Sequence, residues 1–335
     1  MMGIAVALTL GVSARAQTDL GTAGAYNLFV TGNHSATNVD ILGKVAVGGD
    51  ATYTNFTIGS SQPTGSAVNT VVGGNYSNAG GTVNGSQIVG GNYSQSNPTV
   101  FGSIDANGNV TLGDGSVSGI IKHGGSADVK PYMESQLQTG TTALPINFVA
   151  EQAYLLNASQ TWGALTGMAA IPEAGTNNYF LTGTDASLNI FTLSYSQLAA
   201  STTFQISAPS GSTVLVNVLG GNGTNFTLPN NGAISVSGTT LDKVLVNLPD
   251  ATSINLAGSW NSSLLAPNAT VTGTSGDFNG NLIARSLNGG GLELHDRLFT
   301  GHINGGGGNP IPEPGTCVLF APGLLVLGAV LRRRK

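Results

Sequence analysis

Residue types that bind metal ions or transfer protons gather at one place in this sequence. The segment GLELHDRLFTGH, residues 291–302, contains Glu293, His295 and Asp296. Glu293 and His295 are two positions apart, so on a β-strand their side chains lie on the same face. A carboxylate beside an imidazole suits a metal site or an acid–base pair. The competing interpretation, which the sequence favours, is a charged cap that closes the end of a repetitive β-structure.

The rest of the chain offers little further chemistry. Its single cysteine, Cys317, lies near the C-terminus, so the body has no disulfide and no thiolate metal site. The body has no G-x-S-x-G elbow, and its Gly-Gly-Asn repeats lack the Lys-Ser/Thr of a phosphate loop. The segment SGDFNGN, residues 275–281, has one carboxylate where a calcium loop needs several, and we interpret it as a corner of the fold. We therefore expect no catalytic residue, no metal and no cofactor.

The composition favours an all-β protein and argues against a nucleic-acid partner. The 335 residues include 50 glycines, and only 8% are charged. Low charge with abundant Gly, Val, Thr and Asn is typical of strands joined by many tight corners. The net charge is −5, and five of the eleven basic residues lie in the two terminal segments. The body therefore lacks the basic patch that a nucleic-acid-binding domain needs.

Internal repeats are the strongest signal in the body. Three segments share β-branched residues, a Gly-Gly pair and an Asp or Asn: KVAVGGDATYTN (44–55), TVVGGNYSNAG (70–80) and QIVGGNYSQSN (87–97). Further apolar runs begin at Val214, Val244, Ser263 and Asn281. Such runs predict an irregular right-handed parallel β-helix, a solenoid whose rungs stack about 4.8 Å apart around a continuous core. Its Gly-Gly pairs should lie at equivalent corners. A β-sandwich is the alternative.

One segment breaks the β pattern. In INFVAEQAYLLNASQTWGAL, residues 146–165, apolar residues recur at helical spacing after Pro145. This predicts one long α-helix that packs along the wall of the solenoid. A weaker helical candidate is DVKPYMESQLQ, residues 128–138.

The N-terminal segment has the pattern of a secretory signal. An apolar stretch precedes Ala14-Arg15-Ala16, which matches the small-residue cleavage pattern of signal peptides. We expect residues 1–16 to be this signal and residues 17–303 to form the solenoid domain. Residues 304–311 are Gly-rich and predict a flexible linker.

The C-terminal segment, residues 312–335, has three parts. Pro312, Glu313 and Pro314 come first, an apolar run from Val318 to Leu331 follows, and Arg332, Arg333, Arg334 and Lys335 end the chain. The apolar run predicts a short C-terminal hydrophobic helix of about 21 Å, less than the roughly 30 Å core of a bilayer. We expect a transient transmembrane helix in the inner membrane, with the basic end on the cytoplasmic side.

This tail resembles the PEP-CTERM sorting signal. The resemblance rests on the Pro312-Glu313-Pro314 triplet, the apolar run and the basic end. It implies an exported protein of a Gram-negative bacterium that makes exopolysaccharide. It also implies processing by a membrane exosortase, followed by release to the cell surface or extracellular matrix.

The body resembles the choice-of-anchor A domain. The residues that carry this resemblance are AYNLFVTG (25–32), GKVAVGGDA (43–51), LLAPNATVTG (264–273) and GNLIARSLNGGGLELHDRLFTG (280–301). The resemblance implies an adhesive domain and transfers no catalytic residue. A looser similarity, of architecture alone, exists to β-helical ice-binding proteins, for which TYTNFT, residues 52–57, is the one local hint of a Thr-x-Thr ladder.

These observations favour a non-enzymatic surface or matrix protein that promotes adhesion or associates with exopolysaccharide. Tyr53, Tyr76 and Tyr93 each follow a Gly-Gly-Asx element. They either align on one face as a stacking surface for sugars or pack against the corners of the rungs. One alternative function is a polysaccharide-active β-helix enzyme, which would need clustered carboxylates in a groove. Another is an ice-binding-like surface protein.

Overall fold

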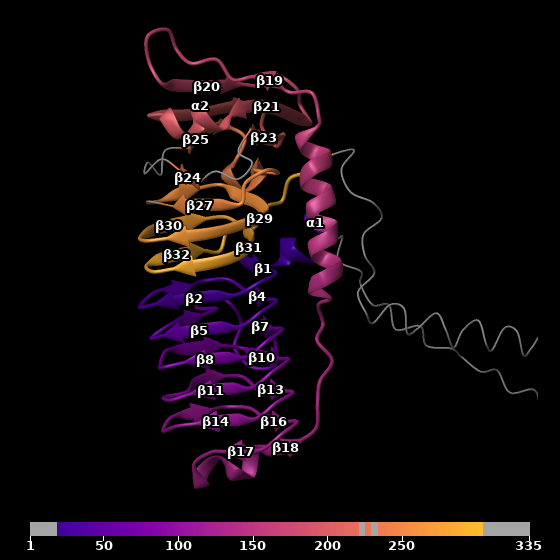
Figure 1. The fold of residues 1–335 in the computed structure, drawn as a ribbon, viewed down its shortest axis with the longest axis vertical. Helices are drawn as coiled ribbons and strands as arrows, with labels where there is room; N and C mark the ends of the chain where they lie inside the picture. The colour runs from indigo at the N-terminus through magenta and orange to yellow at the C-terminus, as the bar shows by residue number, and fades with distance from the viewer. Residues whose placement is uncertain (1–18, 221–224, 229–233, 257, 304–335) are drawn as a thin grey trace, which may run out of the picture.

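Short parallel strands stack into a long β-helix, and one long helix lies along its side (Figure 1). The computed structural model describes residues 19–303, apart from residues 221–224, 229–233 and 257. Within this part of the chain, every pairing between named strands is parallel. The predicted parallel β-helix is therefore confirmed, and the sandwich is excluded. The expected C-terminal hydrophobic helix lies outside the described residues.

Most rungs have three short strands, so the β-helix has three walls. The first wall contains β1 (Leu28–Val30), β4 (Val45–Val47), β7 (Val68–Val72), β10 (Ser86–Val89), β13 (Ile104–Ala106), β16 (Ile121–His123), β18 (Leu137–Thr139), β19 (Met168–Ala169), β21 (Leu188–Ser194), β23 (Thr213–Leu219) and β26 (Val244–Asn247). The second wall contains β2 (His34–Thr37), β5 (Ala51–Thr54), β8 (Tyr76–Asn78), β11 (Tyr93–Gln95), β14 (Val110–Leu112), β17 (Ala127–Asp128), β24 (Asn225–Leu228) and β27 (Ser253–Leu256). Two longer strands, β29 (Ser263–Gly273) and β31 (Leu282–Gly289), run through both walls.

The third wall is built from shorter strands. It contains β3 (Asp40–Ile41), β6 (Thr57–Ile58), β9 (Thr82–Asn84), β12 (Thr99–Phe101), β15 (Ser116–Val117), β28 (Trp260–Asn261), β30 (Gly276–Asn279) and β32 (Leu292–His295). A separate sheet of β20 (Asn178–Thr182), β22 (Thr203–Ala208) and β25 (Ile234–Gly238) lies at one end of the stack. The helices are α1 (Phe148–Gly163), α2 (Tyr195–Ala200) and the 3-10 turns η1 (Thr22–Ala25), η2 (Pro131–Gln136) and η3 (Leu241–Lys243).

The chain starts in the middle of the stack and returns to it. From β1 the rungs descend to β17 and β18, α1 then runs back along the side, and the C-terminal rungs descend from the other end (Figure 1). At the middle, β31 pairs with both β1 and β2, and β32 pairs with β3. Segments from the two ends of the domain are therefore neighbours in one continuous stack.

Gly-Gly pairs lie at equivalent corners, as the repeats predict. The backbone N–H of Gly73 donates to Val47 O at 2.7 Å, and that of Gly90 donates to Val72 O at 2.8 Å. A Cβ atom at Gly73 would lie 2.2 Å from the carbonyl oxygen of Gly48, and one at Gly90 would lie 2.2 Å from that of Gly73. Each corner packs directly on the one before it, which leaves no room for a side chain.

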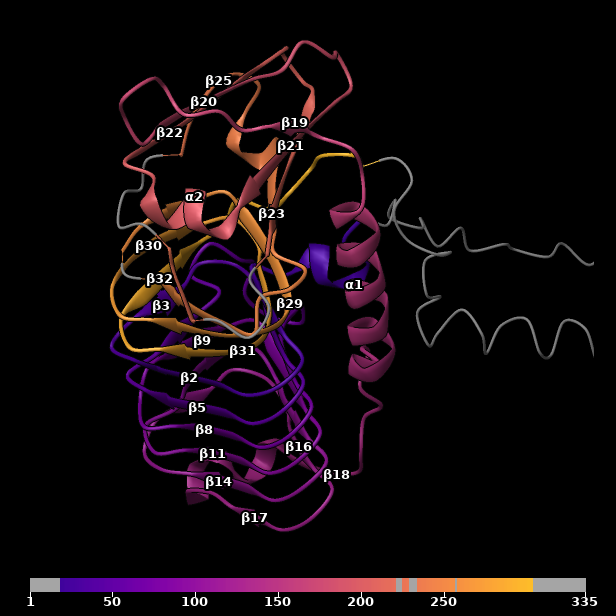
Figure 2. The same ribbon diagram turned by 45° about the horizontal axis from the view of Figure 1, so that its top comes forward.

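The long helix covers the outer surface of the first wall from β23 to β1. The extended segment that precedes the helix runs along the rungs below (Figure 1). Asn147 caps its first turn by accepting the Ala150 N–H at 3.1 Å, and Phe148–Gly163 lies within the predicted range of 146–165. Leu155 and Trp162 are buried against outward-facing residues of the wall such as Phe29 and Leu245. Figure 2 shows that α1 lies along this wall and leaves the second wall uncovered. The weaker helical candidate forms only η2.

Candidate functional site

The second wall presents a flat array of small polar side chains. Along its strands buried and exposed residues alternate, as in β2 and β5. One exposed or half-buried residue per strand lies in direct register with its neighbours. We call this array the polar face; in order along the stack its residues are Thr227, Asn255, Thr272, Asn288, Ser35, Thr52, Ser77, Ser94, Thr111 and Asp128. Neighbouring members are about 4.8 Å apart along the stack.

A shallow groove runs along one border of the polar face, where the two halves of the chain meet. Its volume is about 430 Å³, and residues of β2, β5, β29 and β31 line it. Thr37 and Thr54 are paired in register beside the polar face and line the same groove. Thr52 and Thr54 are exposed, whereas Thr57 lies half-buried on the third wall. Two of the three threonines in the TYTNFT segment therefore face solvent together.

A ladder of Asn and Asp side chains fixes the other border of the polar face. The side-chain oxygens of Asn33, Asp50, Asn75, Asn92 and Asn109 each accept the backbone N–H of the equivalent residue in the next rung, at 2.7–2.9 Å. These residues follow the corner glycines, which explains why the repeats read Gly-Gly-Asx. The ladder ties successive rungs together and holds the polar face rigid.

The three repeat tyrosines do not form a stacking surface for sugars. Tyr53, Tyr76 and Tyr93 are at most 2% exposed and point into the β-helix. The rings of Tyr76 and Tyr93 stack with centroids 4.6 Å apart. Burial raises the pKa of each of these phenols above its ordinary value of 10. The interpretation of a sugar-stacking surface is wrong, because alternation along the strand places the residue after Asx inside the core.

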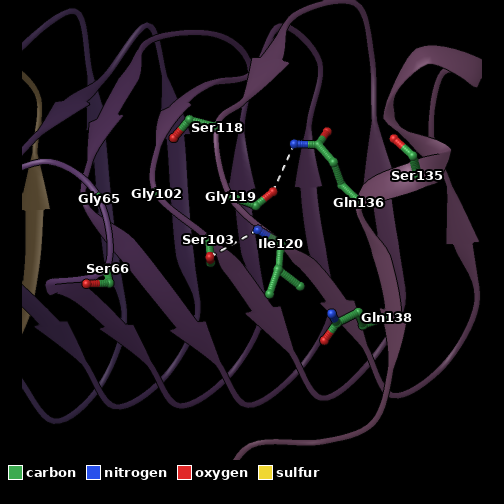
Figure 3. Close-up of a pocket in the computed structure, with 10 residues that line it drawn as sticks. All are labelled: Gly65, Ser66, Gly102, Ser103, Ser118, Gly119, Ile120, Ser135, Gln136 and Gln138. Carbon is green, nitrogen blue, oxygen red and sulfur yellow. Dashed lines mark hydrogen bonds between the residues drawn. The ribbon is translucent and has the colours of Figure 1, made fainter.

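A second shallow groove lies where the third wall meets the first. Its volume is about 520 Å³ (Figure 3). Ser103 Oγ accepts the Ile120 N–H at 3.1 Å, and Gln136 donates to the Gly119 carbonyl at 2.9 Å. The lining residues are Gly, Ser, Gln and Ile. Neither groove is lined by a carboxylate or a histidine.

The structure brings together only two of the three residues that the sequence suggested as a metal or acid–base site, Glu293, His295 and Asp296. Glu293 Oε1 lies 3.2 Å from His295 Nε2 on β32. Asp296 turns away, and its Oδ2 accepts a hydrogen bond from Gln62 Nε2 at 2.5 Å. In its place, Asp277 of β30 joins the pair.

The predicted charged cap at the end of the solenoid is wrong. β32 lies between β30 and β3, in the middle of the stack, because the C-terminal rungs dock onto the N-terminal ones. The strand pattern could have predicted that Glu293 and His295 share a face. It could not show which rung packs beside them, so Asp277 was missed and interpreted only as a corner residue.

The terminal site residues lie outside the described part of the chain. These are Ala14 and Ala16, Pro312, Glu313 and Pro314, and the basic residues from Arg332 to Lys335. In the described residues, no helix combines the length and apolar character needed to cross a bilayer.

The fold is therefore a β-helix in which a helix covers part of one wall and another wall presents a polar face. The chain belongs to the family described as "Putative Ice-binding-like adhesive domain", which matches residues 19–296. It is an adhesive-type domain of a surface or extracellular protein. No curated protein is significantly similar to the chain.

One solved structure matches the chain, the "ice binding protein from an Antarctic bacterium Flavobacteriaceae". It shares 13% sequence identity with a TM-score of 0.31. The match covers 83% of this chain and 98% of that one.

Proposed function

We propose that this protein is a non-enzymatic adhesin whose polar face binds a neutral, regularly repeating polymer, with exopolysaccharide as the leading candidate. The observation that carries the proposal is the register of the polar face. Apart from Asp128 at one end, its members are Ser, Thr and Asn residues without charge. Hydroxyl and amide groups both donate and accept hydrogen bonds, as the hydroxyls of a sugar chain do.

Rigidity supports the same proposal. Binding an extended polymer costs entropy if the protein side must become ordered, and a preorganised surface avoids that cost. The Asx ladder and the buried corners hold the strands of the second wall in fixed register. A wide array of weak, equally spaced hydrogen bonds then adds up along the polymer.

The experiment compares substitutions on the polar face with one elsewhere. Thr52→Lys and Ser77→Lys place long charged side chains in the middle of the polar face, whereas Ser116→Lys places one on an exposed strand of the third wall. In sedimentation with insoluble neutral polysaccharides, including extracellular polysaccharide from the producing cells, we expect the first two to weaken binding about tenfold, equal to ~1.4 kcal/mol. Ser116→Lys should bind as the wild type does. Equal binding by all four proteins would contradict the proposal.

Ice binding is a second candidate, favoured by the register of Thr37 with Thr54 beside the polar face. It would appear as thermal hysteresis that Thr52→Lys abolishes. A polysaccharide-active enzyme has less support, because neither of the two grooves described above is lined by a carboxylate.

We also propose that the domain is of the choice-of-anchor A type and that its tail is a PEP-CTERM signal. An exosortase would cut near Pro312–Pro314 and release the protein from the inner membrane. The three-part pattern of the tail supports this. Mass spectrometry of exported protein should find an end near Pro314, and an intact Lys335 would contradict the proposal.

A further inference from the structure

Four polar side chains form a square on the outer surface of the third wall, away from the polar face. Asp277 on β30 is the register partner of Glu293 on β32, and Asn279 is the partner of His295. The residues between them, Phe278 and Leu294, are buried in the core. Alternation along both strands therefore directs all four polar side chains outward.

Three of these side chains offer metal-ligand atoms that converge. One carboxylate oxygen of Asp277, one of Glu293 and a ring nitrogen of His295 all lie within 4.8 Å of one another. A zinc ion bonded to nitrogen and oxygen donors at about 2.0–2.2 Å holds them roughly 3.3 Å apart in tetrahedral geometry. His295 Nε2 and Glu293 Oε1 are already 3.2 Å apart. Asp277 is exposed, so its side chain can rotate to close the set.

A row of amides orients the imidazole. Asn279 Nδ2 donates to Asn261 Oδ1 at 2.8 Å, which turns Asn279 Oδ1 toward His295. That oxygen lies 3.1 Å from His295 Nδ1, so Nδ1 carries the proton and donates it. In the neutral ring, the lone pair of Nε2 then faces the carboxylate of Glu293. Metal-binding histidines are held in the same way, by a partner on the nitrogen that does not bind the metal.

We propose that Asp277, Glu293 and His295 form a surface site for a divalent transition-metal ion of the zinc class. One imidazole nitrogen with two carboxylate oxygens suits zinc better than calcium or magnesium, which prefer all-oxygen shells. A cation between Nε2 and the carboxylates also removes the repulsion between the lone pair and the negative charge. The side chains of His295 and Glu293 are 33% and 41% exposed, so a fourth position stays open to water or to an oxygen of a bound partner.

The position of the site gives the metal a structural effect. It joins β30 to β32, and β32 pairs with β3 at the junction between the two halves of the stack. An ion that binds the folded state and not the unfolded state raises the unfolding temperature in proportion to the logarithm of its concentration. The inference does not depend on what the polar face binds.

The experiment uses the full chain without an affinity tag, freed of metal by a chelator. Calorimetric titration with ZnCl2 should give one ion per chain, with CaCl2 and MgCl2 binding at least tenfold more weakly. Co²⁺ should give the visible absorption of a low-coordinate site. We expect Asp277→Asn, Glu293→Gln and His295→Gln each to weaken zinc binding at least tenfold and to remove the zinc-dependent rise in unfolding temperature.

His302→Gln is the matched control. His302 also contacts a carboxylate, Asp19, at 3.3 Å, but no second acid within the described part of the chain completes a cluster there. This variant should bind zinc as the wild type does. The three site residues are not in the core, so circular dichroism should find all variants folded. The proposal is overturned if wild-type protein binds no zinc below about 100 µM, if binding survives His295→Gln, or if it is lost in His302→Gln. In the first case the group is only an ion pair between His295 and Glu293.

Discussion

Removing one buried hydroxyl should destabilise the β-helix far more than its size suggests. In Tyr93→Phe the ring stays, but the phenol oxygen is lost. That oxygen donates to Gln95 Oε1 at 2.6 Å and accepts from Gln87 Nε2 at 2.8 Å. All three side chains are at most 1% exposed. Phenylalanine therefore leaves one buried donor and one buried acceptor without those partners.

The magnitude follows from the two orphaned groups. A buried polar group that loses its partner costs about 1–3 kcal/mol. Gln95 keeps a second contact, because its Nε2 donates to Gly81 O at 3.2 Å. The only hydrogen bond described for Gln87 Nε2 is the one that it donates to the Tyr93 hydroxyl. Water cannot easily reach either group inside a packed stack. We expect the free energy of unfolding to fall by about 2–4 kcal/mol.

Urea denaturation at neutral pH measures this loss directly. Tyr132→Phe is the control, because Tyr132 is 60% exposed. The one hydrogen bond described for its hydroxyl is accepted from the Gly115 N–H at 3.1 Å. That change should cost less than about 0.5 kcal/mol. If Tyr93→Phe costs no more than the control, Tyr93 is not the buried, hydrogen-bonded core residue that the fold requires. The alternative of a tyrosine surface for sugars would then return.

Two further predictions test the interior and the corners. Burial lowers the pKa of His34 to about 3, so the stability it contributes is complete above the unfolded value of 6.5 and is lost as the pH falls toward 3. The slope reaches about 1.4 kcal/mol per pH unit only below pH 6.5, so the protonation of His34 should cost wild-type protein ~2 kcal/mol between pH 6.5 and 4.5. Denaturation at both pH values should show a smaller loss in His34→Gln, and equal losses would contradict the burial. Gly90→Ala should lower the free energy of unfolding by more than about 2 kcal/mol, because the new Cβ would lie 2.2 Å from a backbone oxygen. Gly290→Ala is the control and should cost much less, because the nearest atom to its Cβ would be 3.5 Å away. Similar thermal unfolding of the two variants would contradict the corner packing.

The repeats predicted the architecture because one physical rule produces both. A Gly-Gly pair recurs where backbone must touch backbone, and an Asx follows because its side chain bonds to the next corner. The helix was predictable for a similar reason, since apolar residues at helical spacing need a wall to cover. These signals lie within short segments of the sequence, so they predict the fold even when the partner of each strand is unknown.

The candidate site depended on long-range pairing, and so the sequence predicted only part of it. Glu293 and His295 share a face on any strand, but Asp277 joins them only because β30 stacks on β32. The polar face was even harder to predict from the sequence. Thr52 and Ser77 lie within the repeats and Ser35 outside them, and the three residues form a row only because their strands pair in register.

The three walls differ in which side chains they expose to solvent, and this difference decides which wall can present a binding surface. Apolar residues such as Phe29 and Ile283 face outward on the first wall and are buried beneath α1, so this part of the wall is not exposed to a polymer. Several strands of the third wall have only two residues, which gives a narrow and interrupted surface. The second wall alternates strictly, so it can bury one set of residues and leave the other in water.

If the polar face binds a polymer as proposed, the middle of the stack should matter most for adhesion. Ser35 pairs with Asn288 on one side and with Thr52 on the other, so the polar face continues without a break across the junction of the two halves. A polymer lying along the stack would contact both halves at once, and its hold would depend on their staying docked. The helix α1 bridges the same junction on the first wall, where Leu155 and Trp162 belong to one buried cluster with residues of both halves. On the proposed function, an adhesin pulled along its stack would load this junction, and both the helix and the paired strands would resist its opening.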